Sequence, residues 1–388
     1  MDMQPFSNAE NPMSFDAVKE PLATATHAPA YVYGSEEAFQ KEIDEYFMKD
    51  WLYVGREEEL EKAGDYLTMR LVGEPIVIAR DTDGSLNAYY NMCAHRGVEV
   101  AYGNGNTRAF KCPYHGWTYD LKGRLKGAAY MEQSEGFDPS NCRMTPIRLE
   151  TWRGNIFICF SSETVPLAEH LREFERDFGF LQMENCRLGN KTIIHLDCNW
   201  KLVHENLMDF YHVNVLHANT FGAKFTWNNE GVDLKEGGSL SMWYKAGPPT
   251  PGAQPLLGKM PWMEEHDYSF ASEGFLPPNL TLFGRVDCAR PMVVWPLSKD
   301  RCEIIVYQLF PEQVFDRPDI RETLKVYEDY LIKVLDEDRV MIESLQKAMY
   351  TRGFKPGRMS VQEKAIHHYL NSHISRVLEG EKGLQNGA

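Results

Sequence analysis

The spacing of apolar residues changes along the chain, and each change predicts a different kind of structure. Residues 1–45 begin without regular spacing and then run into SEEAFQKEIDEYFMKDW, where apolar residues recur at helical intervals. Ser35 stands before two glutamates, a typical helix start because the serine hydroxyl can accept a hydrogen bond from a backbone N–H of the first turn. We therefore predict a helix that leads into the first domain.

From about residue 51 to residue 165 the chain consists of short runs of β-type composition separated by Gly, Asp and Asn. Asp83-Gly84, between two of these runs, is a typical hairpin turn because glycine tolerates the positive φ that tight turns need. The region therefore predicts a small antiparallel β domain. Its expected strands are YLTMRLV, EPIVIAR, LNAYYNM, AFKCPY and GNIFICF.

Beyond residue 166 helical and β-type segments alternate, which predicts an α+β domain with an antiparallel sheet covered by helices. A long helix is expected at roughly 317–349, and loops rich in Gly and Pro are expected near 247–278. The sequence contains no internal repeat. The other expected elements are the helices AEHLREFERDFGFLQ and WKLVHENLMDFYHVNVLH and the strands LTLFGRV, PMVVWPL and CEIIVYQLF.

Length and charge narrow the range of functions. A chain of 388 residues suggests two domains, since domains usually have about 100 to 200 residues. The 41 Lys and Arg against 56 Asp and Glu give a net charge of −15, which argues against nucleic acid and anionic membranes as partners because both are negative. No stretch of about 18 uncharged apolar residues occurs, and the N-terminus lacks the pattern of a secretory signal. We expect a cytoplasmic protein whose partners are small molecules or other proteins.

Two of the eight cysteines are each followed closely by a histidine. Cys93-x-His95 and, sixteen residues later, Cys112-x-x-His115 each follow a β-type run and precede a glycine, so two tight loops can bring four ligands together. Two thiolates and two imidazoles suit zinc, but such zinc sites usually take both cysteines from one loop. A Rieske [2Fe-2S] centre takes one Cys and one His from each loop. The remaining cysteines lack the dense spacing of a disulfide scaffold, and most are expected to be free thiols.

At CAHRG (93–97) and CPYHGW (112–117) the sequence resembles the Rieske family, in the form found in ring-hydroxylating oxygenases. The resemblance implies that the four Cys and His residues bind a [2Fe-2S] cluster and that the chain is the terminal oxygenase alpha subunit of a multicomponent system. It extends over the whole chain. A Rieske domain is expected at 46–165 and a catalytic domain with a mononuclear non-haem iron at 166–388, with the helix of the N-terminal segment (1–45) packing on the catalytic domain.

His212 and His217 lie five residues apart in a stretch of helical spacing. On an ideal helix five residues turn by about 140°, so both side chains reach one metal only where the helix bends, bulges or ends. Beside a Rieske cluster, two histidines and a carboxylate are the ligand set of mononuclear Fe(II) oxygenases, and this set leaves coordination positions for O₂ and substrate. The run from Glu205 to His217 resembles the catalytic segment of that family.

The resemblance places the third iron ligand on a late helix, at Asp338, because this residue precedes Glu343 by five positions. Asp336 and Glu337 are adjacent, so the register of this assignment stays open from the sequence.

The resemblance also assigns Asn206 and Asp209 to the catalytic machinery. Asp209 lies three residues before His212 and would share its helix face, where one carboxylate oxygen can accept a hydrogen bond from the histidine ring nitrogen that does not bind iron, while the other oxygen stays free. In the family this aspartate reaches across a subunit boundary to a cluster histidine, here His115. A head-to-tail contact of this kind closes into a ring, and we expect a homotrimer, with a separate beta subunit as a further partner that the family admits.

The substrate is less well defined by the sequence. Apolar residues between the metal motifs and the late helix predict a pocket for an aromatic or other apolar small molecule. Arg285 and Arg290 can bind a substrate carboxylate, although the surface is the more usual place for such arginines. The apolar candidates are Trp227, Met242, Trp243, Met260, Trp262, Met263, Phe270, Phe275 and Phe283.

The resemblance covers monooxygenation, dioxygenation and oxidative N- or O-demethylation. The tail LQKAMYTRGFKPGRMSVQEKAIHHYL (345–370) is similar to that of oxygenases of methylated amines and substituted benzenes, which favours monooxygenation. A non-catalytic Rieske electron carrier is the alternative, but it would need only about a third of this chain. The oxygenase reaction would take O₂ and electrons from a ferredoxin or flavin reductase, with NAD(P)H acting only through that reductase. Positive residues on or near the cluster loops are expected to steer this donor: Arg96, Lys111, Lys122, Arg124 and Lys126.

Overall fold

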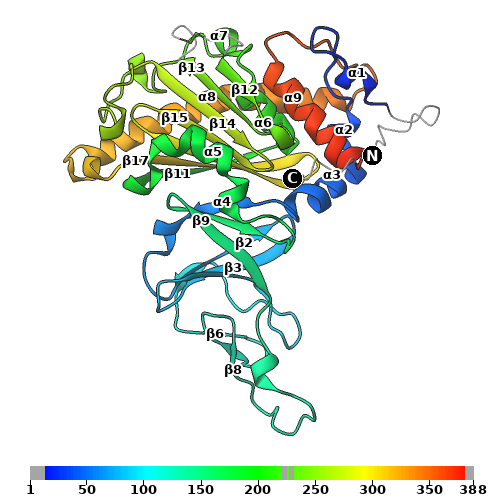
Figure 1. Ribbon diagram of the computed structural model, residues 1–388, viewed down its shortest axis with the longest axis vertical. Coiled ribbons are helices and arrows are strands. Elements are labelled where there is room, and N and C mark those ends of the chain that lie inside the picture. The colour runs from blue at the N-terminus through cyan, green and yellow to red at the C-terminus, as the bar shows by residue number, and fades with distance from the viewer. Residues whose placement is uncertain (1–13, 221–224, 227–230, 381–388) are drawn as a thin grey trace. The chain divides into compact units, whose positions relative to one another are not determined.

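The computed structural model describes residues 14–220, 225–226 and 231–380 (Figure 1). The chain divides into two compact units, Met48–His170 and a second unit formed by Met1–Phe47 together with Leu171–Ala388. The divisions predicted at residues 46 and 166 lie a few residues before these limits. The predicted α+β class, with a small β unit and a larger unit of sheet and helices, is confirmed.

The unit Met48–His170 is built from two antiparallel sheets. The larger sheet has the strand order β1-β10-β9-β4-β3-β2-β5, and the smaller has the order β6-β7-β8. The two Cys/His loops directly follow β4 and β6. The strands are β1 Leu52–Arg56, β2 Asp65–Leu71, β3 Glu74–Arg80, β4 Leu86–Tyr90, β5 Asn104–Asn106, β6 Phe110–Lys111, β7 Thr118–Tyr119, β8 Leu125–Gly127, β9 Pro146–Trp152 and β10 Asn155–Cys159, and α4 Leu167–His170 ends the unit.

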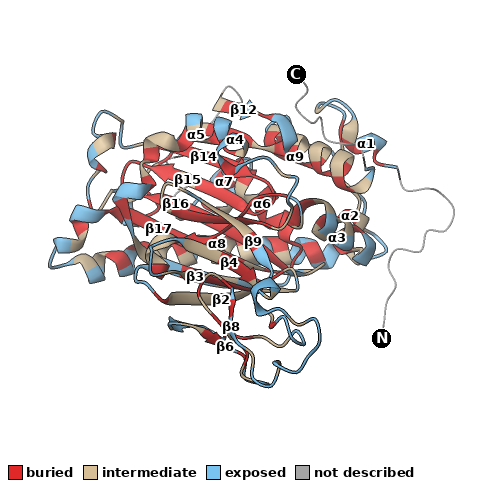
Figure 2. Ribbon diagram, turned by 60° about the horizontal axis from the view of Figure 1, so that its bottom comes forward, coloured by how far each residue is buried: buried red, intermediate tan, exposed pale blue. Residues whose placement is uncertain are grey.

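The second unit is organised around a seven-stranded antiparallel sheet of order β11-β17-β16-β15-β14-β13-β12. Its central strands are mostly buried along their length, because helices and loops cover both faces (Figure 2). Runs of Val, Ile and aromatic residues such as CEIIVYQLF suit these positions, since branched side chains pack well on a pleated surface. The strands are β11 Cys186–Leu196, β12 Val232–Leu234, β13 Leu240–Lys245, β14 Phe270–Leu276, β15 Leu280–Arg285, β16 Ala289–Ser298 and β17 Arg301–Pro311.

Helices of the second unit position the site residues. The 30-residue helix α8 packs against β11, α6 packs against β16, and α9 contacts β12. The N-terminal segment joins this unit through buried contacts such as the hydrogen bond from Trp200 to Glu42. The helices are α1 Asp16–Lys19, α2 Tyr31–Gly34, α3 Glu36–Glu42, α5 Arg172–Phe178, α6 Trp200–Met208, α7 Val213–Leu216, α8 Ile320–Met349 and α9 Lys364–His373, with π-helical turns at Ile43–Phe47 and Ile374–Leu378.

Most of the predicted elements are present. Ser35 caps α3 by accepting a hydrogen bond from the Ala38 N–H at 3.3 Å, as predicted. Gly84 has φ +87° in the predicted hairpin turn. The loop prediction at 247–278 is wrong for Phe270–Leu276, which forms β14. This segment contains no proline and pairs along its length with β13 and β15. Pairing with its neighbours in the sheet, rather than local composition, makes it a strand.

None of the helices in the described part of the chain combines the length and the apolarity needed to cross a bilayer. The cytoplasmic location stays a prediction. None of the eight cysteines forms a disulfide bond, in agreement with the expectation that the chain is not a disulfide scaffold.

Candidate functional site

The two Cys/His loops are copies of one turn. In each, the cysteine N–H donates to the carbonyl five residues later, at 2.8 Å in both loops, and the glycine N–H four residues later donates back to the cysteine carbonyl, at 2.8 Å for Gly97 and 3.0 Å for Gly116. Both glycines have positive φ, +77° and +73°, which side chains disfavour. The glycine after each histidine therefore closes a turn that holds the cysteine at its base and the histidine at its tip.

Burial separates the two kinds of ligand. Cys93 and Cys112 are buried, whereas His95 and His115 are exposed with ring centroids 4.7 Å apart. Within the described residues, only one set of three or more His, Cys, Asp or Glu side chains lies close enough to hold a single ion, and it is not this one. A mononuclear zinc site therefore does not fit these four residues. A cluster in which the cysteines bind one iron and the histidines another does fit them.

Two aromatic residues complete the cluster loops. Trp117 stacks on His95, with ring centroids 4.8 Å apart and an interplanar angle of 8°. The Tyr119 hydroxyl lies 3.1 Å from the Cys93 sulfur and accepts a hydrogen bond from the Ala94 N–H at 3.0 Å. A hydroxyl donor at a ligating sulfur stabilises negative charge there and so raises a cluster's reduction potential. Sequence reasoning missed Tyr119, whose place two residues after Trp117 carries no signal of its own.

The helical stretch that carries the two histidines is interrupted. Helix α6 ends at Met208, Asp209 has the extended backbone angles φ −84° and ψ 99°, and α7 begins after His212 and ends before His217. This break removes the 140° separation that a continuous helix would impose. The requirement that the helix must bend or end for both histidines to meet is therefore satisfied.

His212, His217 and Asp338 meet at one point, with one ligand atom from each within 4.8 Å of the others. The two histidine Nε2 atoms lie 3.3 Å apart, and they lie 3.4 Å and 3.0 Å from the same Asp338 oxygen. Ligand atoms about 2.1 Å from one metal and at right angles to each other lie about 3.0 Å apart. Two imidazole nitrogens and a buried carboxylate oxygen converge at this point, so a cation suits it.

The other nitrogen of each histidine ring is held by a carboxylate. Asp209 Oδ2 lies 3.1 Å from His212 Nδ1, and Glu337 Oε2 lies 2.7 Å from His217 Nδ1. These contacts turn both Nε2 atoms toward Asp338 and make the imidazoles better ligands. Burial lowers the pKa of His212, but the carboxylates of Asp209 and Asp338 outweigh it and raise this pKa to about 9. The surroundings therefore favour positive charge at the point where the three ligands meet.

The structure distinguishes the three neighbouring acidic residues of α8. Asp338 faces the histidines, Glu337 orients His217, and Asp336 forms a partly exposed ion pair with Arg339 at 2.9 Å. Sequence reasoning considered Glu337 only as an alternative ligand and missed its role as the partner of His217.

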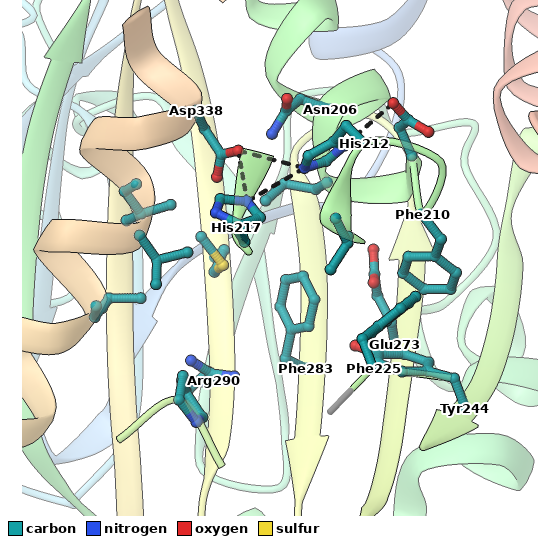
Figure 3. A pocket seen from close by; sticks show the side chains of 18 of the residues that line it. Asn206, Phe210, His212, His217, Phe225, Tyr244, Glu273, Phe283, Arg290 and Asp338 are labelled. Carbon is teal, nitrogen blue, oxygen red and sulfur yellow. Dashed lines mark hydrogen bonds and ion pairs between the residues drawn. The ribbon is translucent and has the colours of Figure 1, made fainter. Parts of the chain in front are cut away.

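Two details of the prediction for Asp209 are wrong. Asp209 does not share a helix face with His212, because α6 has already ended, and the contact is made through a turn. Its second oxygen is not free, since Oδ1 accepts a hydrogen bond from the Tyr211 N–H at 2.7 Å. An oxygen with two lone pairs can still accept another donor. Asn206 lies one turn earlier and lines the pocket beside His212 (Figure 3).

A pocket of about 670 Å³, partly open to solvent, lies beside the three ligands (Figure 3). Two of its charged residues, Glu273 and Arg290, come from strands that pair in register with β15. Glu273 of β14 lies opposite Phe283 of β15, and Phe283 lies opposite Arg290 of β16. Residues opposite each other on antiparallel strands share one face, and two strands span about 10 Å. The pocket floor thus carries an acid and a base with an aromatic ring between them.

The acid and the base are buried without partners. Both carboxyl oxygens of Glu273 lack a hydrogen-bond donor within the described chain. The Arg290 guanidinium makes no hydrogen bond or ion pair with a described residue and packs over the Phe283 ring at 5.6 Å. Arg285, in contrast, donates to the Tyr244 hydroxyl at 2.8 Å. Burial raises the pKa of Glu273 well above its usual range, against the lowering effect of the two arginines. Buried polar groups without partners favour a ligand that supplies hydrogen bonds or an opposite charge to them.

The comparisons with known proteins agree with both centres. Residues 50–148 match the model of the Rieske [2Fe-2S] domain, and residues 183–379, more than half of the chain, match the ring hydroxylating alpha subunit (catalytic domain). The chain belongs to the Rieske-type ring-hydroxylating oxygenases. It is an alpha subunit, and the cofactors of its family are a Rieske [2Fe-2S] cluster and a mononuclear iron that receives electrons from a separate reductase.

Relatives of this oxygenase act on more than one kind of molecule. It is 33% identical over 192 residues to the carnitine monooxygenase oxygenase subunit of Acinetobacter pittii, a match that spans 49% of this chain and about half (52%) of the relative. It is 27% identical over 364 residues to the chloroplastic choline monooxygenase of Arabidopsis thaliana, covering 90% and 83%. A solved quaternary ammonium Rieske monooxygenase, described in terms of carnitine oxidation and inter-subunit electron transfer, shares the fold with a TM-score of 0.73 at 22% identity, covering 93% and 98%.

The pocket of the oxygenase differs from the one expected from the sequence. Phe283 is the only one of the nine predicted apolar residues that lines it among those described, and Trp227 lies outside the described residues. Met242, Met260, Met263 and Phe275 are buried in the core instead. Arg285 and Arg290 are buried, so the surface positions considered for them are wrong. The aromatic residues that line the pocket beside Phe283 are Phe210, Phe225 and Tyr244.

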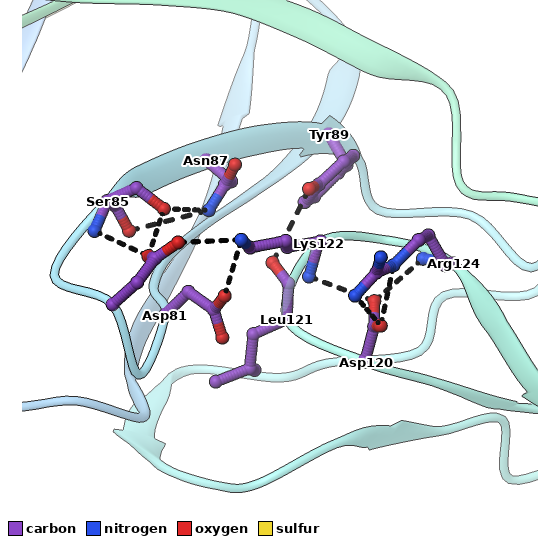
Figure 4. A network of polar contacts seen from close by, with 9 residues as sticks. Asp81, Ser85, Asn87, Tyr89, Asp120, Leu121, Lys122 and Arg124 are labelled. Carbon is purple, nitrogen blue, oxygen red and sulfur yellow. Dashed lines mark hydrogen bonds and ion pairs between the residues drawn. The ribbon is translucent and has the colours of Figure 1, made fainter.

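The positive rim expected around the cluster loops of the oxygenase is smaller than predicted. Lys122 forms ion pairs with Asp83 at 2.6 Å and Asp81 at 3.5 Å, and Arg124 pairs with Asp120 at 2.8 Å (Figure 4). These two side chains are largely neutralised by their partners. The others, Arg96, Lys111 and Lys126, are exposed, and Arg96 lies over the Tyr114 ring.

Proposed function

We propose that this protein is a Rieske monooxygenase that oxidises a carbon bound to nitrogen in a small substrate carrying both a cationic nitrogen and a carboxylate, with release of an amine and an aldehyde. The observation that carries this proposal is the row Glu273, Phe283 and Arg290 on the pocket floor. An apolar arene would leave the buried Glu273 carboxyl and the Arg290 guanidinium without polar partners, at a cost of about 1–3 kcal/mol for each. A zwitterion supplies a partner to each of them.

The orientation of the substrate follows from where the charges lie. We place the nitrogen end of the substrate at Glu273 and toward the iron ligands, because the Glu273 carboxyl lies close enough to His212 for that histidine to lower its pKa. Phe210, Phe225 and Tyr244 pack against one another nearby, with ring centroids 4.5–5.4 Å apart (Figure 3). A carboxylate and aromatic faces are the groups that bind a methylated ammonium. The nitrogen end then lies toward the metal, and Arg290 holds the carboxylate at the far end.

The proposed reaction balances with the family's cofactors. For a methyl group on nitrogen, R₃N⁺–CH₃ + O₂ + 2e⁻ + 2H⁺ gives R₃N⁺–CH₂OH + H₂O, and the C–N bond of this carbinol then breaks to release amine, aldehyde and a proton. The metal, bound by His212, His217 and Asp338, would supply the reduction of O₂, with electrons from the cluster. The chain's own residues bind the two ends of the substrate and orient its nitrogen end toward the metal. The relatives named for carnitine and choline support chemistry at such a nitrogen.

We expect Glu273→Gln to weaken binding of a betaine-type substrate by about 10- to 100-fold, because a charged hydrogen bond contributes about 1.5–3 kcal/mol. Arg290→Met should weaken binding of the same substrate by a similar factor. Binding of a choline-type analogue, which lacks the carboxylate, should be nearly unaffected. Calorimetric titration of iron-loaded protein measures both effects. Glu303→Gln is the matched control. Glu303 lies on β17, and its carboxylate forms a partly exposed pair with His195 at 3.5 Å. Normal binding of zwitterions by both pocket variants, together with turnover of arenes, would contradict the proposal.

We also propose that Cys93, Cys112, His95 and His115 hold the [2Fe-2S] cluster. Cys112→Ser is expected to remove the visible absorption of the cluster and the rhombic electron paramagnetic resonance signal of its reduced form, because serine is a poor ligand for a Rieske iron. Cys142→Ser, at a half-buried cysteine of the same unit, is the control and should keep both signals. A Cys112→Ser protein that keeps the rhombic signal would show that the cluster is elsewhere.

The electron donor is proposed to be an acidic ferredoxin or reductase domain that docks on the exposed cluster histidines through Arg96 and Lys111. Neutralising both residues with glutamine should slow reduction of the cluster several-fold at low ionic strength and reduce the salt dependence. Lys122→Gln combined with Asp83→Asn removes an ion pair without changing the net charge, so it is the matched control. If the stopped-flow rate of cluster reduction in the native protein does not change with ionic strength, electrostatic steering is ruled out.

A further inference from the structure

Tyr244 and Arg285 lie in a second row on the pocket floor, next to the row that holds Glu273. Tyr244 of β13 lies opposite Ala271 of β14, and Ala271 lies opposite Arg285 of β15. Residues opposite each other on antiparallel strands share one face, and the outer two of three adjacent strands stand about 10 Å apart. Because the alanine side chain is a single methyl group, the two longer side chains meet above it. Arg285 Nη2 donates a hydrogen bond to the Tyr244 hydroxyl there, at 2.8 Å.

The Arg285 guanidinium is held in place by the backbone of two strands. It is buried, and its Nη1 donates to the Gly284 carbonyl at 3.1 Å and to the Ser272 carbonyl at 3.4 Å. A guanidinium has no acceptor atom, so the Tyr244 oxygen can only accept a hydrogen bond from it. The O–H proton of Tyr244 therefore points away from Arg285 and remains available to another acceptor.

The Tyr244 hydroxyl donates to no acceptor among the described residues. Tyr244 is only 9% exposed, lines the pocket and extends from β13 toward Phe283 (Figure 3). Burial raises the pKa of Tyr244 to about 12, against the lowering effect of Arg285, so the hydroxyl keeps its proton at neutral pH. A buried donor that lacks an acceptor costs free energy, which an oxygen atom of a ligand in the pocket would recover.

We propose that Tyr244 and Arg285 form an oxygen subsite, and that the preferred substrate carries a hydroxyl group on its carbon chain, close to the cationic nitrogen. Glu273, where we place the nitrogen, lies diagonally across from Tyr244 on the neighbouring strand, and the α-carbons of such pairs are about 7–8 Å apart. A hydroxyl group near the nitrogen therefore comes within reach of Tyr244. This inference rests on the zwitterionic substrate proposed above and adds a third polar contact to it.

A hydroxyl group suits this position better than other oxygen groups. It can accept the proton of Tyr244 and donate its own to Glu273, whose two carboxyl oxygens lack donors within the described chain. A fully methylated ammonium has no N–H group, so it offers Glu273 a charge but no hydrogen bond. A second carboxylate, in contrast, would add a negative charge beside the Glu273 carboxyl. Tyr244 contacts the substrate, whereas Arg285 acts through Tyr244 and is a positioning residue.

The first test compares two betaine-type ligands of the same length, one with a hydroxyl group on the second carbon from the nitrogen and one without it. In calorimetric titrations of iron-loaded protein, the native chain should bind the hydroxylated ligand about 10-fold more tightly. Tyr244→Phe keeps the ring and its packing against Phe210, so it should weaken binding of the hydroxylated ligand alone, by about 10-fold. Tyr350→Phe removes a hydrogen bond to Asp300 outside the pocket, and this matched control should bind both ligands like the native chain.

Arg285→Met tests the positioning role. In the native chain it should reduce the preference for the hydroxylated ligand several-fold, but in the Tyr244→Phe background it should not change that preference further, because residues that act through one contact are not additive. If Tyr244→Phe does not fold, loss of the preference in Arg285→Met decides the question.

Equal binding of the two ligands by the native chain, or a preference that survives in Tyr244→Phe, would overturn the oxygen subsite and leave the zwitterion proposal intact. A native chain that binds neither ligand would end both proposals.

Discussion

Asp338→Ala is expected to lose the mononuclear iron while the [2Fe-2S] cluster remains, and turnover should fall by at least about 100-fold. Removing residues that only orient metal ligands typically costs 10–100-fold, so the loss of a ligand should cost at least as much. The reason lies in the geometry, since the Asp338 oxygen is the atom that both histidine Nε2 atoms approach, at 3.0 Å and 3.4 Å. Iron and sulfide analysis of the purified protein measures the effect, with about one iron per chain lost and the sulfide unchanged.

Asp336→Ala is the matched control, because Asp336 lies two residues earlier on the same helix and pairs only with Arg339 at the surface. It should keep its iron and its activity. If Asp336→Ala loses the iron and Asp338→Ala keeps it, the ligand assignment is wrong.

Asp209→Asn is expected to keep both metal centres and yet pass electrons to the mononuclear iron at least about 100-fold more slowly. We propose that the oxygenase works as a ring of three subunits in which Asp209 connects His212 to the cluster histidine His115 of a neighbouring subunit. Asparagine can still accept the hydrogen bond from the Tyr211 N–H, so the turn after α6 should survive the change. Rapid reduction of the cluster followed by slow oxidation of it by O₂ in the presence of substrate would show the block.

Glu337→Gln is the control for Asp209→Asn because Glu337 holds the other histidine, His217, in the same way. It should weaken iron binding without blocking electron transfer in the molecules that retain iron. Near-normal turnover of Asp209→Asn, or full activity in a protein shown by sedimentation to be monomeric, would end the proposal of electron transfer across subunits.

The cluster loops were predictable from the sequence because the chemistry and the turn are local. Cys93 and His95, like Cys112 and His115, lie within one turn, and the glycine that each turn requires stands four residues after the cysteine. The iron ligands were only partly predictable from the sequence. The helix break after Met208 that brings His212 and His217 together is not marked by Gly or Pro. The requirement for a break could be stated, but its position could not.

The pocket floor was not predictable, because it depends on register between strands. Glu273 and Arg290 are 17 positions apart in sequence and face the same pocket only because β14, β15 and β16 pair with Phe283 opposite both. A shift of one residue in either pairing would turn the opposed side chain to the other face. Composition marked the right region as apolar, but Phe275 and Met242, which share the sheet face of Glu273, are buried in the core and do not line the pocket. The charges that decide the proposed substrate come from long-range pairing.

The proposed function is tested most directly by product analysis with the iron-loaded oxygenase, a reductase and a panel that contains a betaine-type zwitterion, a choline-type alcohol and an arene of similar size. The account predicts that the zwitterion is turned over most efficiently, yielding one amine and one aldehyde for each O₂ consumed. Formation of a ring diol or phenol from the arene, with no amine or aldehyde from the zwitterion, would contradict it.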